Sequence, residues 1–168
     1  MNISINKKII YNFFSKENIL SLMIITIIFI SDRLTKIKII NLQDNNKSIY
    51  INEYLNFDLV WNTGIGFGLF DMDANLTYHI ISLIILIVIL FIIFIIIKST
   101  NLEKFFYAII LGGAFGNLYD RISYFAVPDF IDIHYNDYHW FTFNIADIFI
   151  TLGIILILIK ETKKNHNE

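Results

Sequence analysis

The stretch Ile80–Ile97, IISLIILIVILFIIFIII, decides the fold of this chain. Only Ser82 interrupts its eighteen residues, and a helix of that length spans most of the hydrocarbon core of a bilayer. The whole chain agrees, because 56% of its 168 residues are hydrophobic and only 17% are charged, far from the balance of a soluble domain. The sequence therefore predicts an integral membrane protein of the α-helical class.

Three further apolar segments accompany this run, and each carries polar residues near one end. Together they predict four transmembrane helices in a single domain over residues 1–168, at about residues 18–40, 77–97, 104–124 and 141–159. The outer loops are expected at about residues 41–76 and 125–140.

Basic residues predict the orientation of these spans. On one side lie Lys7, Lys8, Lys16, Lys98, Lys104, Lys160, Lys163 and Lys164. The loops on the other side hold one basic residue, Lys47, and eight acidic ones. By the positive-inside rule both termini are cytoplasmic. A cleaved signal peptide at the N-terminus is the weaker interpretation, because no small-residue cleavage site follows the first apolar run.

Two matching motifs, Asn117-x-x-Asp120 and Asn144-x-x-Asp147, lie inside apolar segments. A carboxylate at membrane depth costs roughly 2.5–3.5 kcal/mol on insertion scales, so such residues normally face the interior of a helix bundle. At about 1.5 Å of helix rise per residue, Asp32 lies at the same depth as both motifs, near the outer face of the membrane. Each Asn shares a helix face with its Asp at i and i+3. A buried acidic site near the outer boundary is predicted.

Plainer roles remain open for several of these residues. Asp32 and Lys36, at i and i+4, could form no more than an intrahelical ion pair. Asp120 could be the permanently ionised partner of the adjacent Arg121. The two Asn side chains could be interhelical hydrogen-bond partners without chemistry. Gly112, Gly113 and Gly116 are expected to let helices approach closely, a packing role.

Two acids differ from the others: Asp147, and Asp129 in the segment between the two motifs. No Lys or Arg occurs between Arg121 and Lys160, so neither carboxylate has a local cation. Two carboxyl groups brought together in such surroundings share a proton, one acting as base and one as acid, as the activation of water against an amide requires.

No metal or other cofactor is expected from the sequence. His134 and His139 follow no strong metal pattern and are expected to face solvent in an outer loop. The chain has no cysteine, which excludes disulfides, thiol catalysis and cysteine-ligated metals.

Five motifs together resemble the lipoprotein signal peptidase family, signal peptidase II of bacteria. They are SDRLTK at 31–36, WNTGIGFG at 61–68, GGAFGNLYDR at 112–121, VPDF at 127–130 and FNIAD at 143–147. The resemblance covers about residues 19–160. It implies that Asp129 and Asp147 form an aspartic peptidase dyad. Positions that support the dyad or line the substrate pocket would be Asp32, Lys36, Asn62, Gly64, Asn117, Asp120, Arg121, Asn144 and Ala146.

The resemblance also implies the reaction and its setting. Members of the family remove signal peptides from diacylglyceryl-modified prolipoproteins at the outer face of the bacterial cytoplasmic (inner) membrane. The expected partners are the lipid-modified substrate and membrane lipid, with no nucleic acid and a monomeric enzyme. A small β-structure between the first and second helices would cradle the substrate, and a short loop element would lie between the third and fourth.

Two positions depart from the family pattern, and one rival function remains. Pro128 precedes Asp129 where an aliphatic residue is more usual, and Arg33 stands where the family often has Gln. Arg33 is expected to point toward lipid headgroups or solvent, with little effect on catalysis. The rival is a small proton- or cation-coupled transporter using buried aspartates, which would need polar groups along a path through the membrane.

Overall fold

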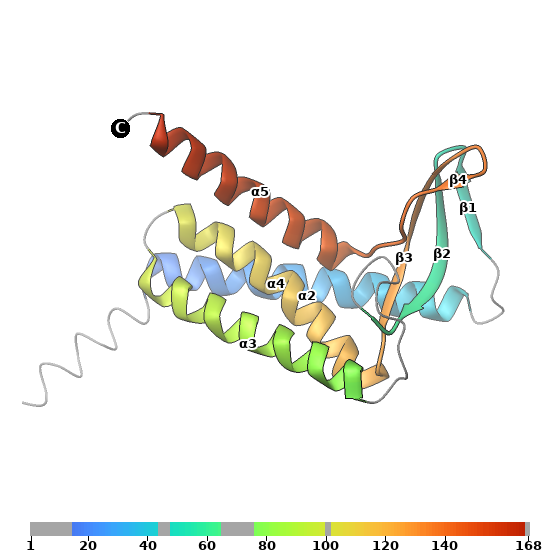
Figure 1. Ribbon diagram of the computed structural model, residues 1–168, viewed down its shortest axis with the longest axis horizontal. Helices are drawn as coiled ribbons and strands as arrows, with labels where there is room; N and C mark the ends of the chain where they lie inside the picture. Colours follow the sequence, from blue (N-terminus) through green and yellow to red (C-terminus); the bar gives the residue numbers. More distant parts are fainter. Residues whose placement is uncertain (1–14, 44–47, 65–75, 100–101, 167–168) are drawn as a thin grey trace, which may run out of the picture.

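The fold is known from a computed structural model, in which residues 15–43, 48–64, 76–99 and 102–166 are described. Its helices are α2 (Lys16–Leu42), α3 (Leu76–Lys98), α4 (Leu102–Tyr124) and α5 (Ile145–Asn165). At one end of the molecule lie the start of α2, the end of α3, the start of α4 and the end of α5 (Figure 1). A small sheet lies at the other end. Three of the four predicted spans match their helices within two residues at each end.

The helix of the fourth predicted span begins later and ends later than expected. Residues 141–144 are not helical, and α5 begins at Ile145 with Asn144 as its N-cap. The spacing of Asn144 and Asp147 is therefore that of a capping box, in which each side chain accepts from the other residue's backbone N–H. The shared helix face that the sequence predicted does not exist for this pair.

The sheet contains β1 (Ile49–Asn52), β2 (Leu55–Asn62), β3 (Val127–Tyr135) and β4 (Tyr138–His139), antiparallel and in that order. The β-structure predicted between the first two spans is thus confirmed by β1 and β2. The short loop element expected at residues 125–140 is instead a nine-residue strand and a hairpin added to the same sheet. Pairing with β2 explains this, since an apolar run next to an open strand edge gains ladder hydrogen bonds that a loop would lack.

α4 lies against each of the other three helices, and its glycines permit the approach. A Cβ on Gly112 would lie 2.9 Å from Cβ of Ile28 on α2, and one on Gly113 would lie 2.5 Å from the carbonyl oxygen of Ala146 on α5. A Cβ on Gly116 would collide with the carboxylate of Asp32. The predicted packing role of these glycines is confirmed.

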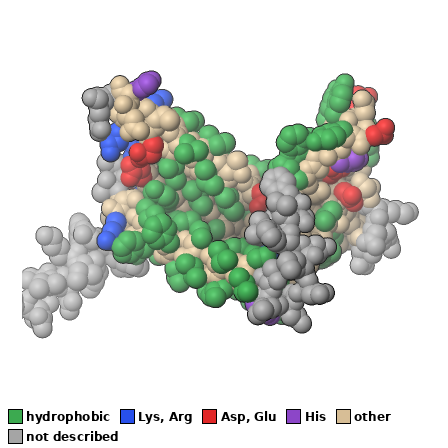
Figure 2. All heavy atoms as spheres, viewed as in Figure 1, with side chains coloured by type: hydrophobic (Ala, Val, Ile, Leu, Met, Phe, Trp, Pro, Cys, Tyr) green, Lys and Arg blue, Asp and Glu red, His purple; other side chains and the backbone are tan. Residues whose placement is uncertain are grey.

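The outward helix surfaces are apolar. On the face drawn in Figure 2, hydrophobic side chains cover the middle of the helices, whereas the visible Lys and Arg side chains gather at the end away from the sheet. Within the described residues, two helices are long and apolar enough to cross a membrane, Lys16–Leu42 with mean hydropathy 1.6 and Tyr78–Lys98 with 3.9. Apolar side chains turned outward are what lipid contact requires.

Candidate active site

The polar residues of three helices and two strands meet at the end of the helices that carries the sheet. Asp129 comes from β3, not from the loop element expected there, and Asp147 lies in the first turn of α5. Asp129 is only 5% exposed. The bulge in β2 between Phe57 and Val60 resets the register so that Val60 pairs with Asp129.

Amide side chains hold both carboxylates. Asn62 and Asn144 each donate from Nδ2 to Asp129, to Oδ2 at 2.9 Å and to Oδ1 at 2.5 Å. Asn117 donates from Nδ2 to Oδ1 of Asp147 at 2.8 Å. The second oxygen of Asp147 accepts from the backbone N–H of Asn144 at 3.1 Å. All four carboxylate oxygens are therefore held by neutral donors.

Asn144 joins the two acids directly. Its Nδ2 reaches Asp129, while its Oδ1 accepts from the backbone N–H of Asp147 at 3.1 Å. The side chain is fully buried, so neither bond competes with water. A single helix cap thus fixes the position of one carboxylate relative to the other.

The surroundings of Asp129 favour its protonated form. Burial raises the pKa of Asp129, the negative charge of Asp147 raises it further, and the hydrogen bonds from Asn62 and Asn144 oppose both, leaving a pKa of about 6. This carboxyl group can therefore hold or release a proton near neutral pH, as acid–base catalysis requires.

Lys36 organises the polar network beneath the dyad. Its Nζ, fully buried, donates to Asp32 at 2.8 Å, to Asn117 at 2.9 Å and to Asp120 at 2.6 Å. Asp32 in turn accepts from the backbone N–H of Ala146 at 3.0 Å. The intrahelical ion pair considered for Asp32 and Lys36 is present, and it also connects three helices.

The alternative that paired Asp120 with Arg121 and the position predicted for Arg33 are both wrong. Arg33 is buried, pairs with the carboxylate of Asp120, and donates to the hydroxyl of Tyr124 at 3.1 Å. Its guanidinium also lies 4.5 Å from the ring centre of Tyr119. The spacing of Arg33 and Lys36, i and i+3, was the signal for two cations on one face of the first helix.

Arg121 turns away from Asp120 because adjacent residues on a helix point in directions about 100° apart. Its Nη2 donates to the carbonyl oxygen of Gly64 at 2.5 Å, and Gly64 donates from its N–H to Oδ1 of Asn62 at 3.0 Å. Arg121 therefore ties the end of β2 to the site. The rest of the predicted glycine motif, residues 65–68, lies outside the described residues, as do Lys7, Lys8 and Lys47.

Sequence reasoning missed one residue near the site, Gln43. It caps the end of α2, is 3% exposed, and exchanges 2.5 Å hydrogen bonds with the carbonyl oxygen of Phe57 and the N–H of Leu59. Gln43 thereby fixes β2, which carries Asn62, to α2, which carries Lys36.

A shallow apolar groove of about 410 Å³ lies between α2 and α4 on another side of the bundle. Its lining consists of Ile25, Thr26, Phe29, Phe115, Leu118, Tyr119 and Ile122. None of these is an acid or amide of the polar network, so the groove is not the site of the chemistry. Tyr119 connects the groove to the polar network, since its ring also contacts the guanidinium of Arg33.

Apolar helices that enclose two amide-held carboxylates at one end define the class: a helical membrane enzyme with acid–base chemistry. Comparison with known proteins narrows this class. A model of the family described as signal peptidase (SPase) II matches residues 24–163. The chain belongs to the signal peptidase II family.

Individual relatives agree with the family match. A lipoprotein signal peptidase of Pelagibacter ubique (strain HTCC1062) is 46% identical over 155 residues, covering 91% of this chain and 93% of the relative. The lipoprotein signal peptidase of Anaplasma phagocytophilum (strain HZ) is 34% identical, and the match covers 89% of this chain and 96% of that relative. A bacterial membrane enzyme solved by the in meso method at 2.3 Å superposes with a TM-score of 0.74 at 32% identity. The superposition covers 89% of this chain and 91% of that enzyme. These matches identify a peptidase and give the transporter alternative no support.

Proposed function

We propose that this protein removes signal peptides from diacylglyceryl-modified prolipoproteins, using Asp129 and Asp147 as an aspartic peptidase dyad. The observation that carries the proposal is the double role of Asn144, which binds Asp129 and caps the helix turn that bears Asp147. The names of the relatives supply the substrate class, since they are lipoprotein signal peptidases.

The mechanism is hydrolysis by a water molecule held between the two carboxyl groups. The ionised carboxylate takes a proton from this water as the water oxygen attacks the scissile carbonyl carbon. The protonated partner polarises the carbonyl oxygen, and a proton then passes to the leaving amine as the C–N bond breaks. With its pKa near 6, Asp129 is suited to carry the shared proton. The pair titrates as a unit.

Arg121 is suited to bind the substrate backbone. Among the described residues, nothing accepts a hydrogen bond from its buried Nε and Nη1. Buried guanidinium N–H groups without acceptors are costly, and a peptide carbonyl would satisfy them. Asn62 and Gly64, which Arg121 holds in place, would form the neighbouring wall of the substrate pocket.

The proposed setting is the bacterial inner membrane, with four spans, both termini cytoplasmic and the dyad toward the extracytoplasmic side. The common end shared by the helix termini and the opposite position of the sheet support this topology (Figure 1). Membrane lipid would surround a monomer, and the acyl chains of the substrate, held in the bilayer, would position its peptide bond.

The test is a gel-shift assay on a diacylglyceryl-modified prolipoprotein. Asp129→Asn and Asp147→Asn should each abolish processing while the protein still inserts into the membrane, because each variant leaves only one titratable carboxyl group in the pair. Asp137→Asn is the matched control, since Asp137 is an exposed acid in the same outer segment, and it should cleave normally. Near-normal cleavage by either dyad variant would refute the mechanism.

A further inference from the structure

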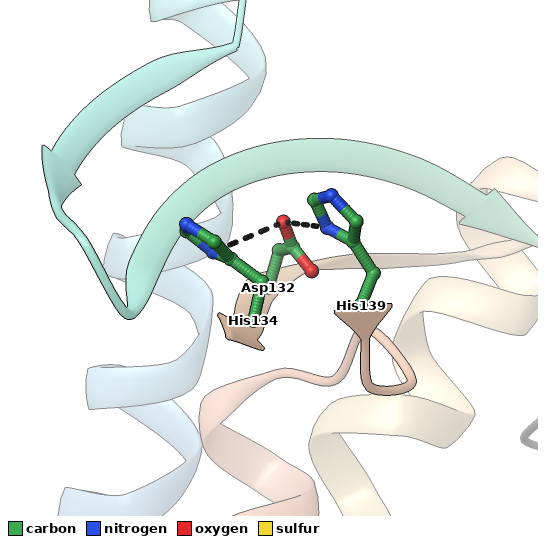
Figure 3. A group of neighbouring side chains, drawn as sticks. All are labelled: Asp132, His134 and His139. Atoms are coloured by element: carbon green, nitrogen blue, oxygen red, sulfur yellow. Dashed lines mark hydrogen bonds and ion pairs between the residues drawn. The ribbon is translucent and has the colours of Figure 1, made fainter. Parts of the chain in front are cut away.

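A second group of titratable side chains lies on the outer sheet. Asp132 and His134 are two residues apart on β3, and His139 on β4 is the cross-strand partner of His134. Residues at i and i+2 of a strand, and residues directly opposite on its neighbour, project from the same face of a sheet. The three side chains accordingly point toward one another, as Figure 3 shows.

The distances within this cluster suit a common ligand. Oδ2 of Asp132 lies 2.8 Å from Nδ1 of His139 and 3.8 Å from Nδ1 of His134. One ligand atom from each residue can be chosen so that all lie within 4.8 Å of one another. Bonds of about 2.0–2.2 Å in a tetrahedral zinc site separate neighbouring ligand atoms by about 3.3–3.6 Å, so small side-chain rotations would suffice.

Burial and charge also favour a cation here. Nδ1 of His134 is buried and has no hydrogen-bond partner among the described residues, a state that a bound metal would relieve. The side chain of His139 is 55% exposed and leaves the cluster open to solvent. The described outer segments 48–64 and 125–140 contain no Lys or Arg, but they do contain the acids Glu53, Asp58 and Asp137.

The cluster is separate from the peptidase site. Asp129 and Asp132 are three residues apart on β3, so they project from opposite faces of the strand. Asp129 bonds to Asn62 and Asn144, whereas the polar partners of the Asp132 carboxylate within the described segments are the two histidines. A ligand of the cluster would thus contact the back of the strand that presents Asp129.

We propose that Asp132, His134 and His139 bind one divalent transition-metal ion, of which Zn²⁺ is the representative. Two imidazoles and one carboxylate supply three ligands, and water takes the open fourth position. The ion ties β4 to β3 and so stiffens the hairpin on the strand that carries Asp129. The two-residue turn at 136–137, with Asn136 at a left-handed φ of 52°, already sets the two histidines opposite each other.

The experiment uses the full chain in detergent, purified through a tag without histidine and stripped with a chelator. Titration with ZnCl₂ should give saturable binding of one ion per chain and a higher Tm, whereas MgCl₂ should give neither. Co²⁺ in place of zinc should show the strong visible absorption of four-coordinate cobalt. His139→Gln should weaken zinc binding at least tenfold, since it removes one of three ligands.

Control variants locate the ion. His79→Gln changes an exposed histidine on α3 and should leave binding unchanged. The double variant Asp129→Asn, Asp147→Asn should also bind normally, because the dyad is not the metal site. Asp132→Asn keeps the shape of the side chain and tests the cluster if His139→Gln does not fold. Absence of saturable zinc binding, or binding that survives both His139→Gln and Asp132→Asn, would overturn the proposal.

Discussion

Neutral amides, rather than cations, hold both carboxylates of the dyad. Asn62, Asn117 and Asn144 donate to oxygens of Asp129 or Asp147, while Lys36 is linked to Asp147 through Asn117. A cation in direct contact would keep both groups ionised, whereas amide donors orient the oxygens and still permit one of them to be protonated. Each amide therefore adjusts the proton affinity of the pair.

The pH profile should respond to Asn62. As pH rises through the pKa of Asp129, about 6, the pair loses its shared proton and kcat/KM of the free enzyme should fall. The bond from Asn62 stabilises the ionised form, so Asn62→Leu should raise the pKa and move this fall to higher pH. A bond to a charged group is worth about 1.5–3 kcal/mol, so the expected shift is about one pH unit or more.

A measured profile of kcat/KM against pH checks this prediction. Asn52→Ala, an exposed change on β1, is the control and should retain the wild-type profile. A fall in kcat/KM that stays in place or moves to lower pH in Asn62→Leu would contradict the assigned role.

Arg33→Gln should lower the thermal stability of the protein in detergent. It removes the partner of a buried carboxylate, but Lys36 still contacts Asp120, so the loss should be smaller than the about 3–5 kcal/mol of a fully orphaned charge. In the Asp120→Asn background the same substitution should cost less, which a double-mutant cycle of unfolding free energies would reveal.

Lys38→Gln serves as the control in that cycle, because Lys38 is an exposed cation on the same helix and should change stability by less than about 0.5 kcal/mol. If Arg33→Gln is as stable as the wild type, Arg33 faces lipid or solvent after all.

Which polar residues the structure brings together was largely predictable from the sequence, whereas their pairings were not. Apolar surroundings marked Asp32, Asn117 and Asp147 as buried, and helix rise placed them at one depth. Adjacency in the chain then suggested Arg121 as the partner of Asp120. Which cation reaches a carboxylate depends on the rotation of one helix against another, and no local spacing encodes that rotation.

At the scale of elements, the α4–α5 contact sets the dyad because Gly113 lies directly against Ala146, next to Asp147. Gly113→Ala would place a methyl group 2.5 Å from the carbonyl oxygen of Ala146, and no rotamer can relieve a collision with backbone. The first turn of α5 must then move. A displacement of about 1 Å can cost about 100-fold in rate, so kcat should fall by about that factor.

Gly153→Ala is the matched variant for this contact. It overlaps Cγ1 of Ile110 at 2.5 Å in the same helix pair, but it lies seven residues further along α5, about 10 Å from Ala146. Thermal unfolding should show both variants destabilised by about 1–3 kcal/mol, with kcat of Gly153→Ala within a few-fold of wild type. Equal losses of kcat in the two variants would mean that the contact acts on stability alone.

The element boundaries that the sequence missed are those that tertiary contacts decide. Phe141 to Phe143 read as the start of an apolar span, yet the backbone of Phe143 pairs with Ile131 of β3. The capping-box signature at Asn144 was the local signal for a later helix start. Residues 125–140 carried no strand signal strong enough to reveal their pairing with β2, since long-range pairing is invisible in a single segment.

At the scale of the whole molecule, the topology can be tested because the chain contains no cysteine, so any introduced cysteine is unique. Asp137→Cys lies in an exposed turn of the sheet and Lys163→Cys in the exposed last turn of α5. In intact cells stripped of their outer membrane, a membrane-impermeant maleimide should label the first variant. The second should be labelled only after the inner membrane is opened, and labelling of both in sealed cells would contradict the proposed orientation.

The cap of α5 also makes the site observable by hydrogen exchange. N–H groups in the first turn of a helix ordinarily lack an intrahelical acceptor and exchange readily. Here the amide protons of Ala146 and Asp147 are bound to Asp32 and Asn144, so their exchange requires that bonds of the catalytic network open. Slow exchange at these two amides would measure how rarely the dyad comes apart, in the absence of any substrate.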